Sequence, residues 1–267
     1  MTKKTQRYRL TIEYDGTNYA GWQRQNDQPT VQEALMNAIY HFCRQRVNVV
    51  GAGRTDSGVH ATAQVAHIDI DRKMDGFKVM QGINYYLFNP PISQENMAAD
   101  FNKLWPENRI AVLDAKAVGD DFDARFSAIR RHYMYRIINR RQRLALEEGR
   151  AWHVIEELDD KKMQEAANIL VGHHDFTSFR DTMCQSKSPE KTLEKLDIIR
   201  RGNEIHITAS ARSFLHHQVR NMVGTLSLVG KGKWQVEDVR TALEAKDRKA
   251  GGPTCPASGL YFIGVDY

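Results

Sequence analysis

One acidic residue, Asp56, stands in a glycine-rich loop and follows directly on an Arg-Thr pair, in the stretch GAGRTDSGVHA over residues 51–61. The flanking residues 47–50 and 64–70 are rich in β-branched side chains or alternate in polarity, which predicts a strand on each side. Glycines permit positive φ and let a substrate approach the backbone closely. An ionised carboxylate there could act as a nucleophile or as a base, although most single aspartates in such loops are solvated turn residues.

Two phosphate-binding motifs that are also glycine-rich do not fit this loop. A Walker loop ends in Gly-Lys-Ser/Thr, and no such triplet follows. A dinucleotide-binding fingerprint needs a glycine where Asp56 stands and should open a helix, whereas the residues from Val65 onward alternate as a strand does. A carboxylate would also repel a phosphate, so the loop is not predicted to cradle one.

A basic partner for Asp56 is available on the predicted helix 214–229. Its apolar stripe runs from Leu215 through Val219 to Leu226, and at about 100° per residue Arg220 falls off the middle of that stripe. Arginine offers a carboxylate a rigid, permanently charged fork and would keep Asp56 ionised beside a polyanion. The alternative is an ordinary surface arginine.

An aromatic partner is available on the predicted strand 131–138. Tyr133 and Tyr135 share one face of this strand, so either both belong to the core or both line a groove. A tyrosine exposed in a groove beside basic residues could stack on an extruded base.

The chain is predicted to form two α+β halves, residues 1–109 with the Asp56 loop and residues 110–267 with Tyr133 and Arg220. A capping box at residues 30–33 begins the first helix. The order strand, helix, strand, strand, helix, strand is ferredoxin-like, a frequent scaffold of RNA-binding modules. Strands are expected at residues 8–14, 47–50, 64–70, 110–117, 131–138, 192–199, 204–211 and 260–267, and helices at 31–42, 77–85, 94–104, 160–170, 214–229 and 236–245.

The charge of the chain favours a polyanionic partner. The 267 residues carry a net charge of +5, with a pI near 9.0. Basic residues cluster at Arg130-Arg131, Arg140-Arg141 with Arg143, Arg200-Arg201 and Lys231 with Lys233. Each cluster alone is usually a solvated face, but together with the interleaved tyrosines they favour RNA or DNA.

The three cysteines, Cys43, Cys184 and Cys255, form no disulfide framework and no metal-binding spacing, as expected for a reducing cytoplasm. No signal peptide and no apolar run of about 18 residues is seen, so no membrane association is expected. The pairs at 173–174 and 216–217 are not predicted to bind metal, because adjacent histidines should point in different directions.

The motif over residues 53–61 resembles the active-site motif of the TruA family of tRNA pseudouridine synthases. Further matches follow in the order of that family from about Tyr8 to Tyr267. They lie at residues 14–16, 21–23, 124–128, 131–135, 174–179, 214–224 and 259–261.

The resemblance implies a pseudouridine synthase fold, with two ferredoxin-like or RRM-like halves around a central, mainly antiparallel sheet, helices packed on it and an RNA-binding cleft. It implies an isomerase acting on uridines 38, 39 and 40 of the tRNA anticodon stem-loop, as a cytoplasmic homodimer without metal or organic cofactor. The implied roles place Asp56 as the catalytic aspartate, Arg220 as its partner and Tyr133 as the active-site tyrosine. Arg54 resembles the arginine that holds the target nucleotide out of the stack, and Leu260 an apolar residue packed against the base.

Arg140 and Arg141 are expected to contact tRNA phosphates. Two departures from the family pattern concern the longer segment from Phe88 to Arg109 and Asp123, which stands where a histidine is frequent. Two alternative functions remain open from the residues alone: a non-catalytic RNA-binding protein, and a hydrolase acting on nucleosides.

Overall fold

The computed structural model describes residues 5–89 and 109–267, which divide into two compact units. The first comprises residues up to Ile129 together with 262–267, and the second comprises Arg130–Tyr261. The sequence places the boundary at residue 109 instead. The strand that follows this position, β4, pairs along its length with the first strand of the chain, so residues 110–118 belong to the first unit.

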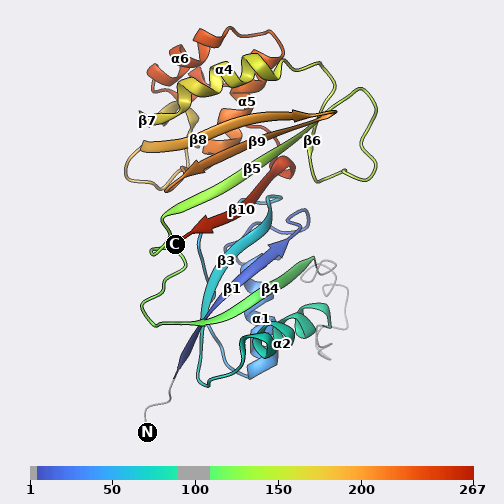
Figure 1. Cartoon of the computed structure of the whole chain (residues 1–267), viewed down its shortest axis with the longest axis vertical. Helices are drawn as coiled ribbons and strands as arrows, with labels where there is room; N and C mark the ends of the chain where they lie inside the picture. The colour runs from blue at the N-terminus through green and yellow to red at the C-terminus, as the bar shows by residue number, and fades with distance from the viewer. Residues whose placement is uncertain (1–4, 90–108) are drawn as a thin grey trace. The chain divides into compact units, whose positions relative to one another are not determined.

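The first unit has the order strand, helix, strand, strand, helix, strand that the sequence predicts (Figure 1). Its sheet order is β4-β1-β3, with β2 paired to β3, and every pairing is antiparallel. This is the ferredoxin-like strand order. Its elements are β1 (Gln6–Tyr14), α1 (Val31–Cys43), β2 (Val50–Gly51), β3 (His60–Ile70), α2 (Gly76–Phe88) and β4 (Ile110–Val118).

The helices of the first unit begin and pack as their sequences dictate. The Thr30 side chain accepts a hydrogen bond from the Glu33 amide at 3.4 Å, the expected N-cap of α1, while the Glu33 carboxylate forms an ion pair with Arg24. Gly82 of α2 lets the Phe42 ring of α1 approach closely, because a Cβ at this position would lie 2.1 Å from the ring. Alternating side chains of β1 fill the core beneath them.

One predicted strand of the first unit is shorter than expected. Residues 47–50 were expected to be extended, yet β2 contains only Val50–Gly51. Val49 is fully buried, and its carbonyl oxygen accepts a hydrogen bond from the Gln32 side chain of α1 at 2.8 Å. The Gln32 side chain thus makes the hydrogen bond that a neighbouring strand would otherwise make with Val49. The predicted helix 94–104 lies outside the described residues.

The second unit contains an antiparallel sheet in the order β5-β9-β8-β7, with β6 parallel to β5 on the other side. Strand β10 begins in this unit and ends in the first. The elements are β5 (Arg130–Asn139), β6 (Trp152–Val154), α4 (Asp160–Leu170), β7 (Gly172–Asp175), β8 (Glu190–Arg201), β9 (Glu204–Ala211), α5 (Gln218–Gly230), α6 (Val236–Glu244) and β10 (Leu260–Asp266). Sequence reasoning missed the short strands β6 and β7.

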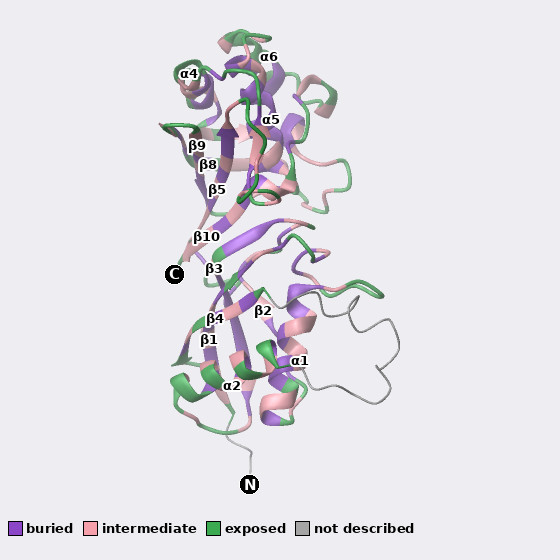
Figure 2. Cartoon of the chain, turned by 90° about the vertical axis from the view of Figure 1, so that its right-hand side faces the viewer, coloured by how far each residue is buried: buried purple, intermediate pink, exposed green. Residues whose placement is uncertain are grey.

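Helix α5 is buried around most of its circumference, and α4 and α6 pack beside it (Figure 2). It was predicted to start at Phe214, but it begins at Gln218. His217 has φ of 60°, in the left-handed region, so the residues before it cannot continue the helix backwards. Within residues 5–89 and 109–267, no helix is both long and apolar enough to cross a bilayer.

Candidate active site

The Asp56 loop, residues 52–59, joins β2 to β3 in the first unit. The residue just before Asp56, Thr55, fixes the loop to the core. Thr55 is buried, and its hydroxyl shares a 2.8 Å hydrogen bond with the Tyr14 hydroxyl. The Trp22 amide donates to the Thr55 carbonyl oxygen at 3.0 Å. Asp56 is half-buried and Arg54 is exposed. The loop thus holds its threonine in the core and leaves Asp56 partly exposed.

The backbone of residues 16–21 lies directly against this loop. The Tyr19 carbonyl oxygen accepts hydrogen bonds from the Gly58 amide at 3.3 Å and from the Ser57 hydroxyl at 3.2 Å. Gly21 has φ of +96°, and a Cβ there would lie 2.5 Å from the Thr55 carbonyl oxygen and 3.0 Å from the Asp56 carbonyl carbon. Only glycine fits this contact, which therefore sets the position of Asp56.

An ionic cluster fastens the end of the loop where β3 begins. Asp15 lies 2.8 Å from Arg109 and 3.2 Å from His60 Nδ1, and the same ring nitrogen lies 3.0 Å from the Gly16 amide nitrogen. Burial works to raise the pKa of Asp15, but the contacts with His60, Thr17 and Arg109 outweigh it and hold that pKa below its ordinary value. The Asp15 carboxylate therefore stays ionised at neutral pH.

Tyr133 lies on β5 in the second unit, opposite Ala209 of β9. Its ring meets the edge of the Phe214 ring at a centroid distance of 5.2 Å, and 9% of the residue is exposed. Tyr135 on the same face is fully buried and donates its hydroxyl to the Pro256 carbonyl oxygen at 2.7 Å. Both tyrosines are buried, so the core alternative is correct for the pair, while a role for Tyr133 in stacking stays a prediction.

Arg220 is the third residue of α5 and is partly exposed, between the buried Val219 and Met222. The prediction that it lies off the apolar stripe is confirmed. Its Nε donates to the Cys255 carbonyl oxygen at 2.9 Å, and the Cys255 amide lies 3.4 Å from the Arg220 carbonyl oxygen. These two contacts fix the stem of the arginine side chain against residues 253–255.

A second arginine, Arg248, holds the segment that supports Arg220. One of its terminal nitrogens donates to the Gly252 carbonyl oxygen at 2.9 Å. The other donates to the Asn221 and Thr254 side chains, each at 3.1 Å. Sequence reasoning missed Arg248, and no pattern marks it, because its partners are backbone carbonyls and side chains up to 27 residues away.

The start of α5 is held by Asp181, a residue that sequence reasoning also missed. Its carboxylate lies 2.7 Å from His217 Nδ1 and 3.7 Å from His216 Nδ1, and it accepts the Met183 amide at 2.7 Å. The expectation that the two adjacent histidines point in different directions is wrong for this pair, since their rings lie 3.9 Å apart. The left-handed backbone of His217 brings the rings to one side.

Leu260 is 6% exposed, at the start of β10. It follows Gly259, where a Cβ would lie 2.5 Å from the Tyr135 ring, so a glycine is needed for this close approach to β5. The chain thus places Leu260 in the same unit as Tyr133 and Arg220, while Asp56 and Arg54 lie in the first unit. The pairing of Asp56 with Arg220 stays a prediction.

The basic clusters of the second unit differ in how far their side chains are engaged. Arg130 forms an ion pair with Glu194, and Arg200 forms one with Asp160. Arg140 folds back on its own loop, with hydrogen bonds of 3.3 Å to the carbonyl oxygens of residues 142 and 143. Arg141 is exposed. Arg130 and Arg200 are therefore weaker candidates for phosphate contacts than Arg141.

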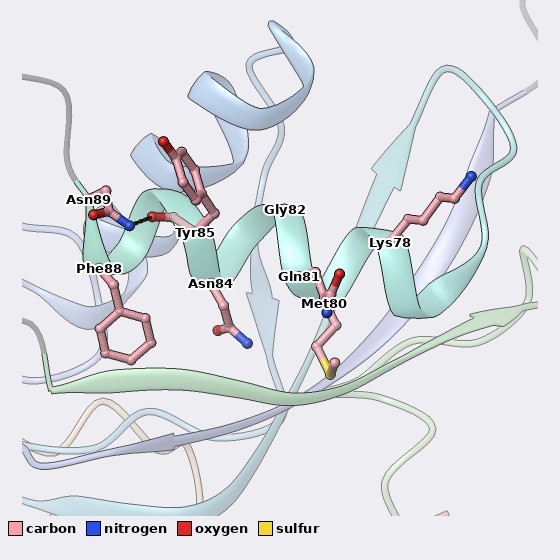
Figure 3. A pocket seen from close by; sticks show the side chains of 8 residues that line it. All are labelled: Lys78, Met80, Gln81, Gly82, Asn84, Tyr85, Phe88 and Asn89. Atoms are coloured by element: carbon pink, nitrogen blue, oxygen red, sulfur yellow. Dashed lines mark hydrogen bonds between the residues drawn. The ribbon is translucent and has the colours of Figure 1, made fainter.

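A surface hollow lies along α2, and none of the predicted site residues lines it (Figure 3). The Asn84 amide, which faces it, is bound to both backbone groups of Val112 at 2.8 Å. The lining residues are Lys78, Met80, Gln81, Gly82, Asn84, Tyr85, Phe88 and Asn89. This hollow brings together no group suited to the chemistry of Asp56.

Comparison with known proteins gives this geometry its context. Residues 10–127 and 166–267 match the sequence model of a family described as tRNA pseudouridine synthase. The chain belongs to the tRNA pseudouridine synthase family. The matched ranges include Asp56, Arg220 and Leu260, whereas Tyr133 and Arg141 lie between them.

Curated relatives match this chain over nearly its whole length. It is 53% identical over 261 residues to tRNA pseudouridine synthase A of Agrobacterium fabrum, covering 98% of this chain and 92% of the relative. It is 52% identical to tRNA pseudouridine synthase A of Rhizobium meliloti, covering 98% and 99%. The same protein of Rhodospirillum centenum is 52% identical over 262 residues, covering 98% and 100%. The predicted family and the α+β fold class are confirmed.

Proposed function

We propose that this chain isomerises uridine to pseudouridine in tRNA and that Asp56 is its catalytic group. Membership of the tRNA pseudouridine synthase family supports the reaction. The observation that carries the residue assignment is the Asp56 loop, whose backbone is held against Tyr19 and Gly21 and anchored by its own Thr55, while Asp56 is only partly buried. A fixed reactive group on a held loop is the arrangement that catalysis requires.

The reaction breaks the bond from uracil N1 to ribose C1′ and forms a bond from C5 to C1′; the hydrogen on C5 leaves as a proton and N1 takes up a proton from water, so the composition of the nucleotide is unchanged. Asp56 either attacks as a nucleophile or removes a ribose proton, and both routes need the ionised carboxylate. Arg220 would keep it ionised when tRNA brings negative charge nearby. The nucleotide must first leave its stack, which costs a few kcal/mol.

The remaining site residues would act on the tRNA. Arg54 is exposed beside Asp56 and would hold the extruded nucleotide. Tyr133 would stack on its base, and Leu260 would pack against that base. Arg140 and Arg141 would contact phosphates, with Arg141 the more available of the two.

The target is proposed to be uridines 38, 39 and 40 of the anticodon stem-loop, and the enzyme a cytoplasmic homodimer. No step needs an oxidant, a reductant or a metal, because the isomerisation consumes nothing. Mapping of pseudouridines in treated tRNA tests the positions, and light scattering of the purified protein tests the dimer. Modification confined to another part of the tRNA would contradict the proposed target.

The decisive experiment uses tRNA labelled with tritium at uracil C5. Tritium release from an intact chain indicates isomerisation, release of free uracil indicates a nucleoside hydrolase, and binding without either indicates an RNA-binding protein. Asp56→Asn should lower turnover by at least about 10²-fold, the lower end of the range for an acid–base group, while tRNA affinity stays near that of the wild type.

Asp27→Asn is the matched control, because Asp27 is an exposed aspartate in another loop of the first unit. It should leave turnover unchanged. Turnover of Asp56→Asn within about tenfold of the wild type would contradict the assignment of Asp56.

A further inference from the structure

Phe126 is the most exposed aromatic side chain in the described part of the chain, with 79% of the residue open to solvent. The guanidinium of its neighbour Arg125, also exposed, lies 5.5 Å from the centroid of its ring. Exposing an aromatic ring of this size to water does not stabilise the folded chain. A single exposed ring is common on protein surfaces, but an arginine over an exposed ring is an arrangement that surfaces binding unpaired bases use.

The loop that carries the pair, residues 123–127, is held by its own hydrogen bonds. The Asp123 carboxylate accepts the amides of Arg125 and Phe126, both at 2.8 Å. The Ser127 hydroxyl accepts the Asp123 amide at 3.0 Å, and the Ser127 amide returns to the Asp123 carbonyl oxygen at 2.9 Å. Asp123 is therefore the residue that sets the direction of the next two side chains.

The same loop is anchored to the body of the first unit through the fully buried Ala124. The Ala124 amide donates to His67 Nδ1 on β3 at 3.0 Å, and its carbonyl oxygen accepts the Tyr267 hydroxyl at 2.8 Å. Burial lowers the pKa of His67, so its ring stays neutral and able to accept. The loop does not have to be ordered when a partner binds, which lowers the entropic cost of binding.

We propose that Phe126 and Arg125 form a stacking contact for an unpaired base of the RNA substrate, with Arg125 against the adjacent phosphate. Unpaired bases stack on exposed aromatic rings, and an arginine beside the ring supplies both a cation–π contact and charge complementary to phosphate. The positive charge beside the ring favours RNA over an apolar protein surface. This inference rests on the proposed function, because it takes tRNA as the ligand.

The test measures the dissociation constant for tRNA at several salt concentrations. Phe126→Ala should weaken binding by about 5- to 150-fold, the range that one base–aromatic stack supplies. Phe126→Leu, which keeps apolar area without an aromatic face, should also weaken it, and Phe126→Tyr should restore it. Arg125→Ala should reduce the salt slope by about one phosphate contact, whereas Phe126→Ala should leave the slope unchanged.

Phe77→Ala is the matched control, because Phe77 is 61% exposed on α2 of the same unit. It should bind tRNA as the wild type does. The inference is overturned if Phe126→Ala retains full affinity, if leucine serves as well as phenylalanine, or if Phe126→Ala acts by dissociating a dimer in light scattering. A wild-type protein that neither binds nor modifies tRNA would contradict the proposed function instead, and the two failures are therefore distinguishable.

Discussion

Gly21→Ala tests whether the close contact of Gly21 with the Asp56 loop sets the position of Asp56, the proposed catalytic residue. Gly21 has φ of +96°, a region that costs a residue with a Cβ about 1–2 kcal/mol. The new Cβ would also lie 2.5 Å from the Thr55 carbonyl oxygen, where real contacts are essentially never under 3.0 Å, so the loop must move by about 0.5 Å (3.0 − 2.5).

Backbone strain and the close contact of the new Cβ can be separated with a variant at a second glycine. Gly202 also has a positive φ, +60°, but nothing lies within 4 Å of the Cβ position. Gly202→Ala should therefore lower the free energy of unfolding by about 1–2 kcal/mol through backbone strain alone. Gly21→Ala should lower it by about 2–5 kcal/mol, because an overpacked contact adds about 1–3 kcal/mol.

The catalytic consequence should distinguish the two variants more sharply than the stability does. A displacement of about 1 Å can lower a rate by about 10²-fold, so a shift of about half that size at Asp56 should lower turnover by roughly 10-fold or more. Tritium release and urea unfolding are the assays, at a temperature where both variants are folded. If Gly21→Ala matched Gly202→Ala in turnover, the contact at Gly21 would not position Asp56, and the reasoning would be refuted.

Three further outcomes follow from the site. Arg220→Lys should lower turnover by at least about tenfold with little change in tRNA affinity, because a point charge cannot reproduce the two-pronged contact with Asp56 that we predict; an equal loss from Arg141→Lys would show that Arg220 is not special. Replacing Arg140 and Arg141 by alanine should flatten the salt dependence of tRNA binding, with the larger share from Arg141, while Asp56→Asn should leave the slope as it is. Asp15→Asn should reduce the free energy of unfolding at pH 7 by about 1.5–3 kcal/mol. Folding lowers the pKa of Asp15, so this loss of unfolding free energy is present above the unfolded-state pKa of about 3.9 and disappears as the pH falls toward the pKa of the folded state. A loss of unfolding free energy that does not change with pH would contradict the prediction.

The side chain of Arg220 lies on a helix, α5, whose start and whose neighbouring segment are each held by a charged residue. Asp181 fixes the residue from which α5 begins, and Arg248 fixes the segment whose carbonyl oxygen receives Arg220 Nε. His217, between them, adopts a left-handed backbone conformation that is uncommon for residues other than glycine. Such conformations persist only where surrounding contacts determine them, which is the role the Asp181 contact fills.

The sequence by itself determined the family, the order of most elements and the place of the Asp56 loop. Those features rest on local signals: the alternation of β1, β3 and β4, the cap at Thr30, and the collinear motifs from Tyr8 to Tyr267. Helix α4 even has the predicted bounds, Asp160–Leu170, because its cap and its apolar spacing are local properties of the chain.

What only the tertiary structure decided depends on partners far apart in the chain. Val49 is not part of a strand, because its carbonyl oxygen accepts a hydrogen bond from the Gln32 side chain of α1. Helix α5 begins at Gln218 because Asp181, 36 residues before His217, holds the preceding turn. Tyr135 proved to be core because Pro256, 121 residues away, accepts its hydroxyl. Sequence periodicity reports which face of an element is apolar, but a hydrogen bond between distant residues leaves no periodic trace, so such contacts can be read only from the folded chain.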